Sequence, residues 1–132
     1  MADNLHIDIV TPTASVFSGN VDEIRVPGWL GEFDVLPGHD LYLSLVRAGL
    51  LTLTVNGQDQ RFIVGRGFAE AGPDQVSILV DSCVAVADAD LTTAQSELDH
   101  AEGTLVNSAM GSPEWATAEE EAEIARAKLA AK

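Results

Sequence analysis

Residues 26–40 contain the side chains best suited to chemistry or to binding. Within a stretch rich in glycine and proline, the segment places two aromatic residues, three carboxylates and a histidine, which are Trp29, Glu32, Phe33, Asp34, His39 and Asp40. Carboxylates beside a histidine could bind a metal ion or transfer protons. Large apolar side chains on constrained backbone suit docking, because little flexibility is lost on binding. The segment has no second histidine and no basic residue, so docking or a structural role is favoured over catalysis.

The rest of the chain carries no signature of a known catalytic centre. It lacks the Gly-x-x-x-x-Gly-Lys phosphate loop, the Gly-x-Ser-x-Gly elbow, the His-Glu-x-x-His zinc motif and the Gly-x-Gly-x-x-Gly dinucleotide motif. The histidines, at positions 6, 39 and 100, are far apart in sequence and indicate no metal site. Cys83 lies in an apolar stretch and is interpreted as a core residue rather than a nucleophile. We therefore expect no catalytic residue, no metal site and no cofactor.

Two acidic groups in the C-terminal part have simple interpretations. Asp88, Asp90 and Asp99 resemble a calcium loop faintly, but the position that requires glycine is Thr93. We interpret Asp90 as the N-cap of a helix, where a carboxylate accepts from free backbone N–H groups. We interpret residues 119–123, with their four glutamates, as a solvated helix face. The basic residues near the end of this helix complement its dipole, and they are Arg126, Lys128 and Lys132.

The overall charge excludes several classes of partner. The 132 residues (13.9 kDa) include 21 acidic and 7 basic side chains, for a formal charge of −14. Nucleic acids and anionic membrane surfaces both require basic residues, so neither is expected as a direct partner. No apolar run is long enough to cross a bilayer, and residues 1–4 lack a signal-peptide pattern, so an intracellular protein is expected.

The chain changes character near residue 88, which predicts an α+β fold in two parts. Residues 1–87 alternate apolar and polar side chains, with a turn signal every eight to ten residues or so. This pattern is typical of an antiparallel β-sandwich, here of about ten strands. Leu5, Ile7 and Ile9 share one predicted buried face, and Asn56-Gly57 predicts a tight hairpin.

Residues 88–132 have a helical period and predict an antiparallel hairpin of two helices. Ser112 and Pro113 mark the start of the second helix. The facing seams are Leu91, Ala94, Leu98, Ala101 and Leu105 in the first helix and Trp115, Ala118, Ala122, Ala125 and Leu129 in the second. Five of these ten are alanine, which buries only a methyl group, so the seam is weak. A permanently folded cap and a detachable arm both remain open.

Short motifs in order along almost the whole chain resemble the epsilon subunit of F-type ATP synthases, to which mitochondrial delta is homologous. They are Val10-Thr11-Pro12, Val16-Phe17-Ser18-Gly19, Pro27-Gly28, Gly31-Glu32-Phe33, Leu36-Pro37-Gly38-His39, Ala48-Gly49, Gly65-Arg66-Gly67-Phe68-Ala69-Glu70 and Val76-Ser77-Ile78-Leu79-Val80-Asp81. Each motif is short, but their order and spacing together are specific. The start of the chain favours a bacterial origin.

The resemblance implies a non-catalytic rotor subunit of a proton-translocating ATP synthase. Its sandwich would contact the gamma subunit and the polar loops of the c-ring, and would transmit rotation between them. Docking on the ring would use six residues, which are Gly31, Glu32, Phe33, Pro37, Gly38 and His39. The subunit would lie on the cytoplasmic face of the bacterial inner membrane, attached only through its complex.

Two departures from the family pattern bear on regulation. Of the family's ATP-binding motif, Asp90 and Ala94 are present, but Thr93 replaces the arginine, so weak or no ATP binding is expected. In many bacteria the arm extends along gamma and blocks hydrolysis at the catalytic alpha and beta subunits. From Leu91 onward this arm has a net charge of −5, which opposes contact with an acidic helix, so inhibition remains open.

Two other functions are compatible with the residues alone. The chain could be a stand-alone sandwich that binds a small ligand and dimerises through its helical hairpin. It could also be a metal-dependent enzyme that uses Glu32, Asp34 and His39.

Overall fold

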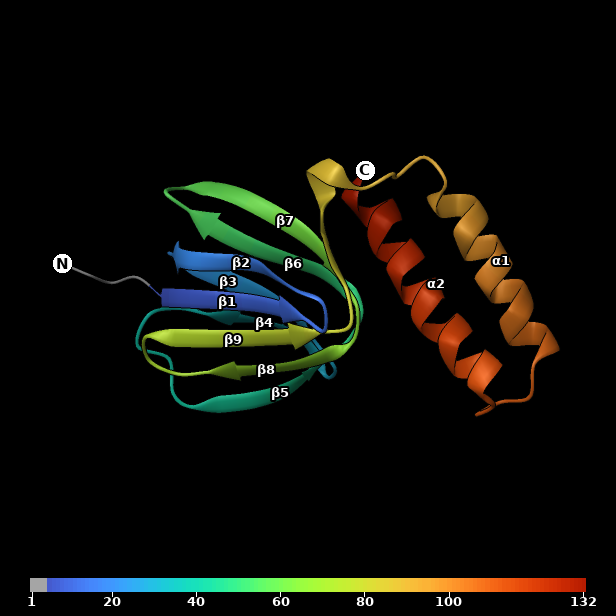
Figure 1. Cartoon of the computed structure of the whole chain (residues 1–132), viewed down its shortest axis with the longest axis horizontal. Coiled ribbons are helices and arrows are strands. Elements are labelled where there is room, and N and C mark those ends of the chain that lie inside the picture. The colour runs from blue at the N-terminus through green and yellow to red at the C-terminus, as the bar shows by residue number, and fades with distance from the viewer. Residues whose placement is uncertain (1–4) are drawn as a thin grey trace.

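The computed structural model describes residues 5–132, so residues 1–4, on which the signal-peptide interpretation rests, lie outside it. The strands are β1 (Leu5–Thr11), β2 (Ala14–Val21), β3 (Glu23–Gly28), β4 (Gly31–Val35), β5 (Tyr42–Val46), β6 (Gly49–Val55), β7 (Gln58–Val64), β8 (Gly67–Ala71), β9 (Gln75–Val80) and β10 (Cys83–Ala85). A short 3-10 turn η1 (Val86–Asp88) leads to helices α1 (Ala94–Asn107) and α2 (Pro113–Ala131). The helices lie side by side at one end of the layered strands (Figure 1).

The strands form one sheet that folds over on itself, which confirms the predicted α+β fold with a sandwich and a helical hairpin. The order is β10-β7-β6-β3-β5-β8-β9-β1-β2, and β4 pairs with β3. All pairs are antiparallel except β1 with β9, where His6 lies opposite Gln75. Parallel strands require a long connection, and here that connection is most of the sandwich.

The core lies between the layers and follows the predicted alternation. Leu5, Ile7 and Ile9 of β1 are completely buried, as are Leu51 and Leu53 of β6. The core contains no residue beyond Ala85, so the helices contribute nothing to it. Since side chains alternate between faces, a slip of one residue in any of these strands would expose its apolar set.

Two local predictions about turns and burial are confirmed. Asn56 and Gly57 both have positive φ, at 51° and 79°, and join β6 to β7 in a tight turn. Cys83 packs against the core, and its burial raises the pKa of the thiol to about 11. This thiol is therefore protonated and unreactive at neutral pH.

The helices begin at different kinds of cap. Ser112 caps α2 as predicted, because its Oγ accepts from the Trp115 N–H at 3.2 Å. The prediction for Asp90 is wrong, since α1 begins at Ala94 with Thr93 at its N-cap. The Asp90 carboxylate instead accepts from the backbone N–H (3.0 Å) and the hydroxyl (2.6 Å) of Thr92. These bonds lower its pKa, and they form a local turn that competes with an earlier helix start.

Small residues and ion pairs hold the two helices together. Ala94 and Ala101 of α1 and Ala118, Ala122 and Ala125 of α2 are buried in the seam. Lys128 of α2 pairs with Glu97 of α1 at 3.0 Å, and Arg126 pairs with Glu102 at 3.4 Å. Neither described helix has an apolar stretch long enough to cross a membrane.

Candidate docking surfaces

Gly31 and Glu32 lie at the end of the sandwich that faces α2. The β3–β4 turn closes here, where Gly28 pairs with Gly31, whose φ of 136° suits glycine. Glu32 is exposed and lies 3.7 Å from the Arg25 guanidinium. It also lines a groove of about 460 Å³ between the sandwich and α2, together with Arg126.

Pro37, Gly38 and His39 lie beyond the opposite end of β4. The backbone N–H of Gly38 donates to the carbonyl oxygen of Pro73 at 2.7 Å, in the turn between β8 and β9. The structure therefore separates the two halves of the predicted docking site by the length of β4. A five-residue strand is about 13–17 Å long.

Phe33 lies in the middle of β4, between these two halves. It contacts Tyr42, a residue that the sequence analysis missed. Tyr42 meets Phe33 edge-on with ring centroids 5.2 Å apart, and it meets His39 at 6.1 Å. Phe33 also covers Gly28, where a Cβ atom would lie only 2.8 Å from the ring. The only sequence signal for Tyr42 was an aromatic residue just beyond the segment. We call Phe33, His39 and Tyr42 the aromatic cluster.

Of the residues of the metal-enzyme alternative, Glu32 and Asp34 share Arg25 as a partner, and His39 contacts a different group. Asp34 accepts from Arg25 Nε at 3.0 Å, and the His39 Nδ1 lies 2.6 Å from the backbone oxygen of its neighbour Asp40. Within residues 5–132, no three metal-ligating side chains come close enough together to hold an ion.

The two residues shared with the ATP-binding motif have different environments. Asp90 is accessible in the turn before α1, although its carboxylate is already bonded to Thr92. Ala94 is completely buried between the helices, so it offers a ligand no surface. Thr93, in place of the arginine, is exposed and supplies no cation.

An exposed apolar row crosses the outer face of four neighbouring strands, and the sequence analysis missed it. Register brings its members opposite one another: Leu45 with Phe68, Phe68 with Leu79, and Leu79 with Val10. We call these four residues the apolar stripe. All are exposed, Leu45 most of all at 61%. A groove of about 470 Å³ runs along Val10, Phe68 and Leu79.

The interpretation of residues 119–123 as a solvated face is wrong for three of its glutamates. Glu123 faces the end of the sandwich, with its side chain only 9% exposed. Arg66 donates to both of its carboxylate oxygens, through Nε at 3.2 Å and Nη2 at 2.8 Å, and Arg47 Nη2 lies 3.6 Å away. Glu119 and Glu120 also bond to Arg66, and Glu121 is exposed. A bidentate arginine at a nearly buried carboxylate is a strong ion pair.

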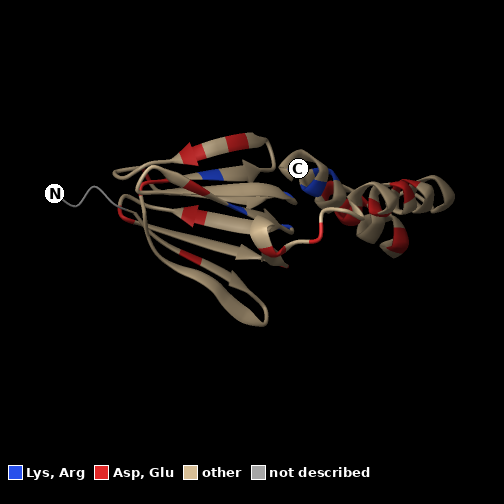
Figure 2. Ribbon diagram, turned by 90° about the horizontal axis from the view of Figure 1, so that it is seen from above, with Lys and Arg blue, Asp and Glu red and all other residues tan. Residues whose placement is uncertain are grey.

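The distribution of charge agrees with this contact. Figure 2 shows lysine and arginine within the strands, at the strand ends that face the helices and on the adjoining part of α2. Acidic residues are spread over the strands and both helices. Three arginines of this acidic chain, Arg47, Arg61 and Arg66, therefore bond to α2 where the two parts meet.

Comparisons with known proteins show which proteins share this sequence and this fold. The family model described as "ATP synthase, Delta/Epsilon chain, beta-sandwich domain" matches residues 4–86. The ATP synthase epsilon chain of Maricaulis maris is 41% identical over 101 residues, 76% of this chain and 76% of that protein. That of Geobacter metallireducens is 40% identical over 105 residues, 80% of this chain and 76% of that protein.

Solved structures show the same fold. A chain of the Euglena gracilis mitochondrial ATP synthase, OSCP/F1/c-ring, superimposes with a TM-score of 0.84 at 19% identity, covering 99% of this chain and 82% of that one. A chain of the Tetrahymena thermophila mitochondrial ATP synthase central stalk/c-ring has a TM-score of 0.66, 13% identity and coverage of 96% and 95%. The match of the family model, and relatives about 40% identical over most of their length, show that this chain belongs to the delta/epsilon chain family of ATP synthases.

Proposed function

We propose that this chain is a non-catalytic rotor subunit of a proton-translocating ATP synthase, which passes the rotation of the c-ring to gamma. Membership of the delta/epsilon family supports this role. The observation that carries it is the apolar stripe, which leaves large side chains exposed on a well-packed sandwich. An exposed row of this kind marks a protein interface. In this role the chain lies on the cytoplasmic face of the bacterial inner membrane, held there by its complex.

The apolar stripe is the surface that binds gamma. Val10, Leu45, Phe68 and Leu79 lie on four adjacent strands, so they form an apolar band across the sheet, with a groove along three of them. An apolar band of this kind can pack against the apolar side of a helix. The acidic residues around it, such as Glu70 beside Leu43, favour a partner with basic residues at its rim.

The c-ring contact runs along β4. This strand pairs only with β3, and its other edge is not hydrogen-bonded to any described strand. All six docking residues lie on β4 or flank it, with Gly31, Glu32 and Phe33 at its start and Pro37, Gly38 and His39 after its end. One unpaired strand edge therefore joins the two groups that lie at opposite ends of the strand.

Charge reversal at the start of β4 tests the ring contact. In the variant Glu32→Lys, which leaves Phe33 in place because that ring packs against the core, we expect at least about a tenfold loss of c-ring from complexes purified through gamma, since an exposed carboxylate is replaced by a cation. Proton-driven ATP synthesis in membrane vesicles should fall in parallel. Glu121→Lys, an exposed reversal on α2, is the control. Unchanged ring content and synthesis would contradict the assignment.

Division of the chain into a sandwich of residues 1–87 and a hairpin of residues 88–132 is a second proposal. The core ends at Ala85, so a chain without residues 88–132 should keep a β-type circular dichroism spectrum and cooperative urea unfolding. It should also still bind gamma, because the apolar stripe lies entirely within the sandwich. A random-coil spectrum would show that the hairpin is required for folding.

A further inference from the structure

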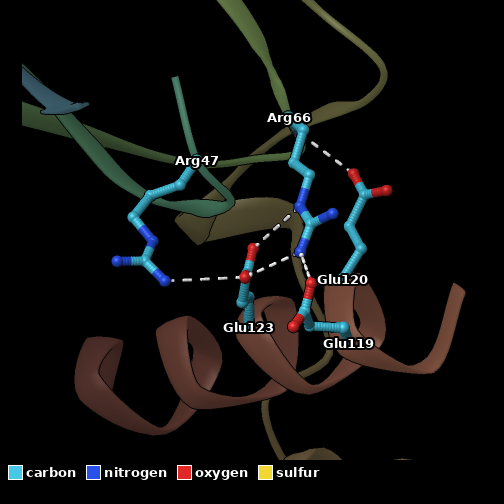
Figure 3. Close-up of polar contacts among 5 residues, drawn as sticks. All are labelled: Arg47, Arg66, Glu119, Glu120 and Glu123. Carbon is cyan, nitrogen blue, oxygen red and sulfur yellow. Dashed lines mark hydrogen bonds and ion pairs between the residues drawn. The ribbon is translucent and has the colours of Figure 1, made fainter. Parts of the chain in front are cut away.

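The contact between α2 and the sandwich is centred on one arginine. Besides its two bonds to Glu123, Arg66 donates through Nη2 to Glu119 Oε1 at 2.8 Å. Its backbone N–H donates to Glu120 Oε2 at 2.9 Å. Figure 3 shows Arg66, between β7 and β8, bonded to three glutamates on α2, and Arg47, between β5 and β6, reaching Glu123. We call these five residues the arginine latch.

Trp29 fixes the two cations in place. The guanidinium carbons of Arg47 and Arg66 each lie 5.4 Å from the centre of its ring. A cation over an indole face is attracted by the ring's electron density. The arginines are therefore held in position for α2, and the contact loses little side-chain freedom when it forms.

Apolar burial in the same contact is small. Where α2 faces β6 and β7, its buried residues are Ala127 and Ala131, and each offers one methyl group. At the C-terminal end of the helix, Arg61 Nη2 donates to the backbone oxygen of Ala131 at 3.0 Å. Polar bonds to three arginines, rather than apolar packing, thus provide most of the specific contacts.

The helices are joined to each other more extensively than to the sandwich. Two ion pairs and five buried alanines connect α1 with α2, whereas α1 lies on the far side of α2 from the strands (Figure 1). Opening the contact at α2 would therefore move both helices together.

We propose that the arginine latch holds the helical hairpin on the sandwich, and that ionic strength opens it and releases the hairpin as one body. Salt screens attraction between charges, and the screening length falls from about 30 Å at 0.01 M to about 3 Å at 1 M salt. Methyl contacts are not weakened in this way. Release would leave Arg47, Arg61 and Arg66 without their partners on α2. The latch is a property of the isolated chain, so it stands or falls independently of the rotor role.

Small-angle X-ray scattering of the full chain tests the latch. In the wild type we expect the radius of gyration to rise as NaCl increases from about 0.01 M to about 1 M. Glu119→Gln with Glu123→Gln should open at low salt, with at least about a tenfold higher ratio of open to closed molecules. Arg66→Glu should raise the ratio of open to closed molecules further. Glu121→Gln, a matched neutralisation on the exposed side of α2, should behave as the wild type.

If Arg66→Glu disturbs the sandwich, the double variant Glu119→Gln with Glu123→Gln, here called the glutamine pair, still tests the latch. Its two residues lie on the helix surface and outside the core. A salt-dependent opening that shifts to lower salt in the glutamine pair supports the latch. If the glutamine pair gives the wild-type scattering curve at every salt concentration, the latch is not what holds the hairpin.

Discussion

Replacing Leu45 and Phe68 with aspartate should remove gamma from the purified complex. The two side chains lie opposite each other at the β5 end of the apolar stripe. Burying a large apolar side chain is worth about 1.5–3 kcal/mol, so losing two costs about 3–6 kcal/mol before the added charges are counted. Since about 1.4 kcal/mol is a factor of ten, affinity should fall at least about 100-fold. Copurification of coexpressed gamma, followed by titration calorimetry, measures the loss.

Leu30→Asp is the matched control for this experiment. Leu30 is 99% exposed in the turn between β3 and β4 and is not a member of the apolar stripe. The same apolar-to-acidic change there should leave gamma in near-equal amount with the chain. Gamma retained equally by the double variant and by this control would rule out the stripe as the interface.

Ile78→Asp should unfold the chain, because Ile78 is completely buried in the centre of β9. An unpaired carboxylate in an apolar core costs several kcal/mol, comparable with the total stability of about 5–15 kcal/mol for a domain. The adjacent change Leu79→Asp faces outward and should shift stability by about 1 kcal/mol or less. Far-UV circular dichroism and urea titration compare the two variants, and equal urea midpoints would contradict the assignment of the two faces.

Local patterns predicted the elements of this fold well. Alternation in β1 identified Leu5, Ile7 and Ile9 as core, since a strand with one buried face must alternate. The Asn56-Gly57 turn was equally predictable from sequence, because few residue pairs adopt positive φ at both positions. Motif order then identified the family, which the sequence relatives confirm.

Features that depend on distant residues were missed. The glutamates at 119–123 have the spacing of a solvent-exposed helix face, and nothing near them in sequence reveals that Arg66 is their partner. The apolar stripe is likewise assembled from four strands, each of which contributes one residue. The prediction that Asp90 caps the first helix failed for a local reason, because the bonds of its carboxylate to Thr92 compete with capping. Whether the six docking residues contact the ring stays a prediction.

The parallel pairing of β1 with β9 sets the order in which a nascent chain can complete its sandwich. β1 can form a hairpin with β2 early in synthesis, since the two are neighbours in sequence. Its second edge stays unpaired until residues 75–79 have left the ribosome. Such non-local closure is slow, and an open strand edge can pair with the wrong chain. Folding of the N-terminal strand is therefore finished only when nearly the whole sandwich has been translated.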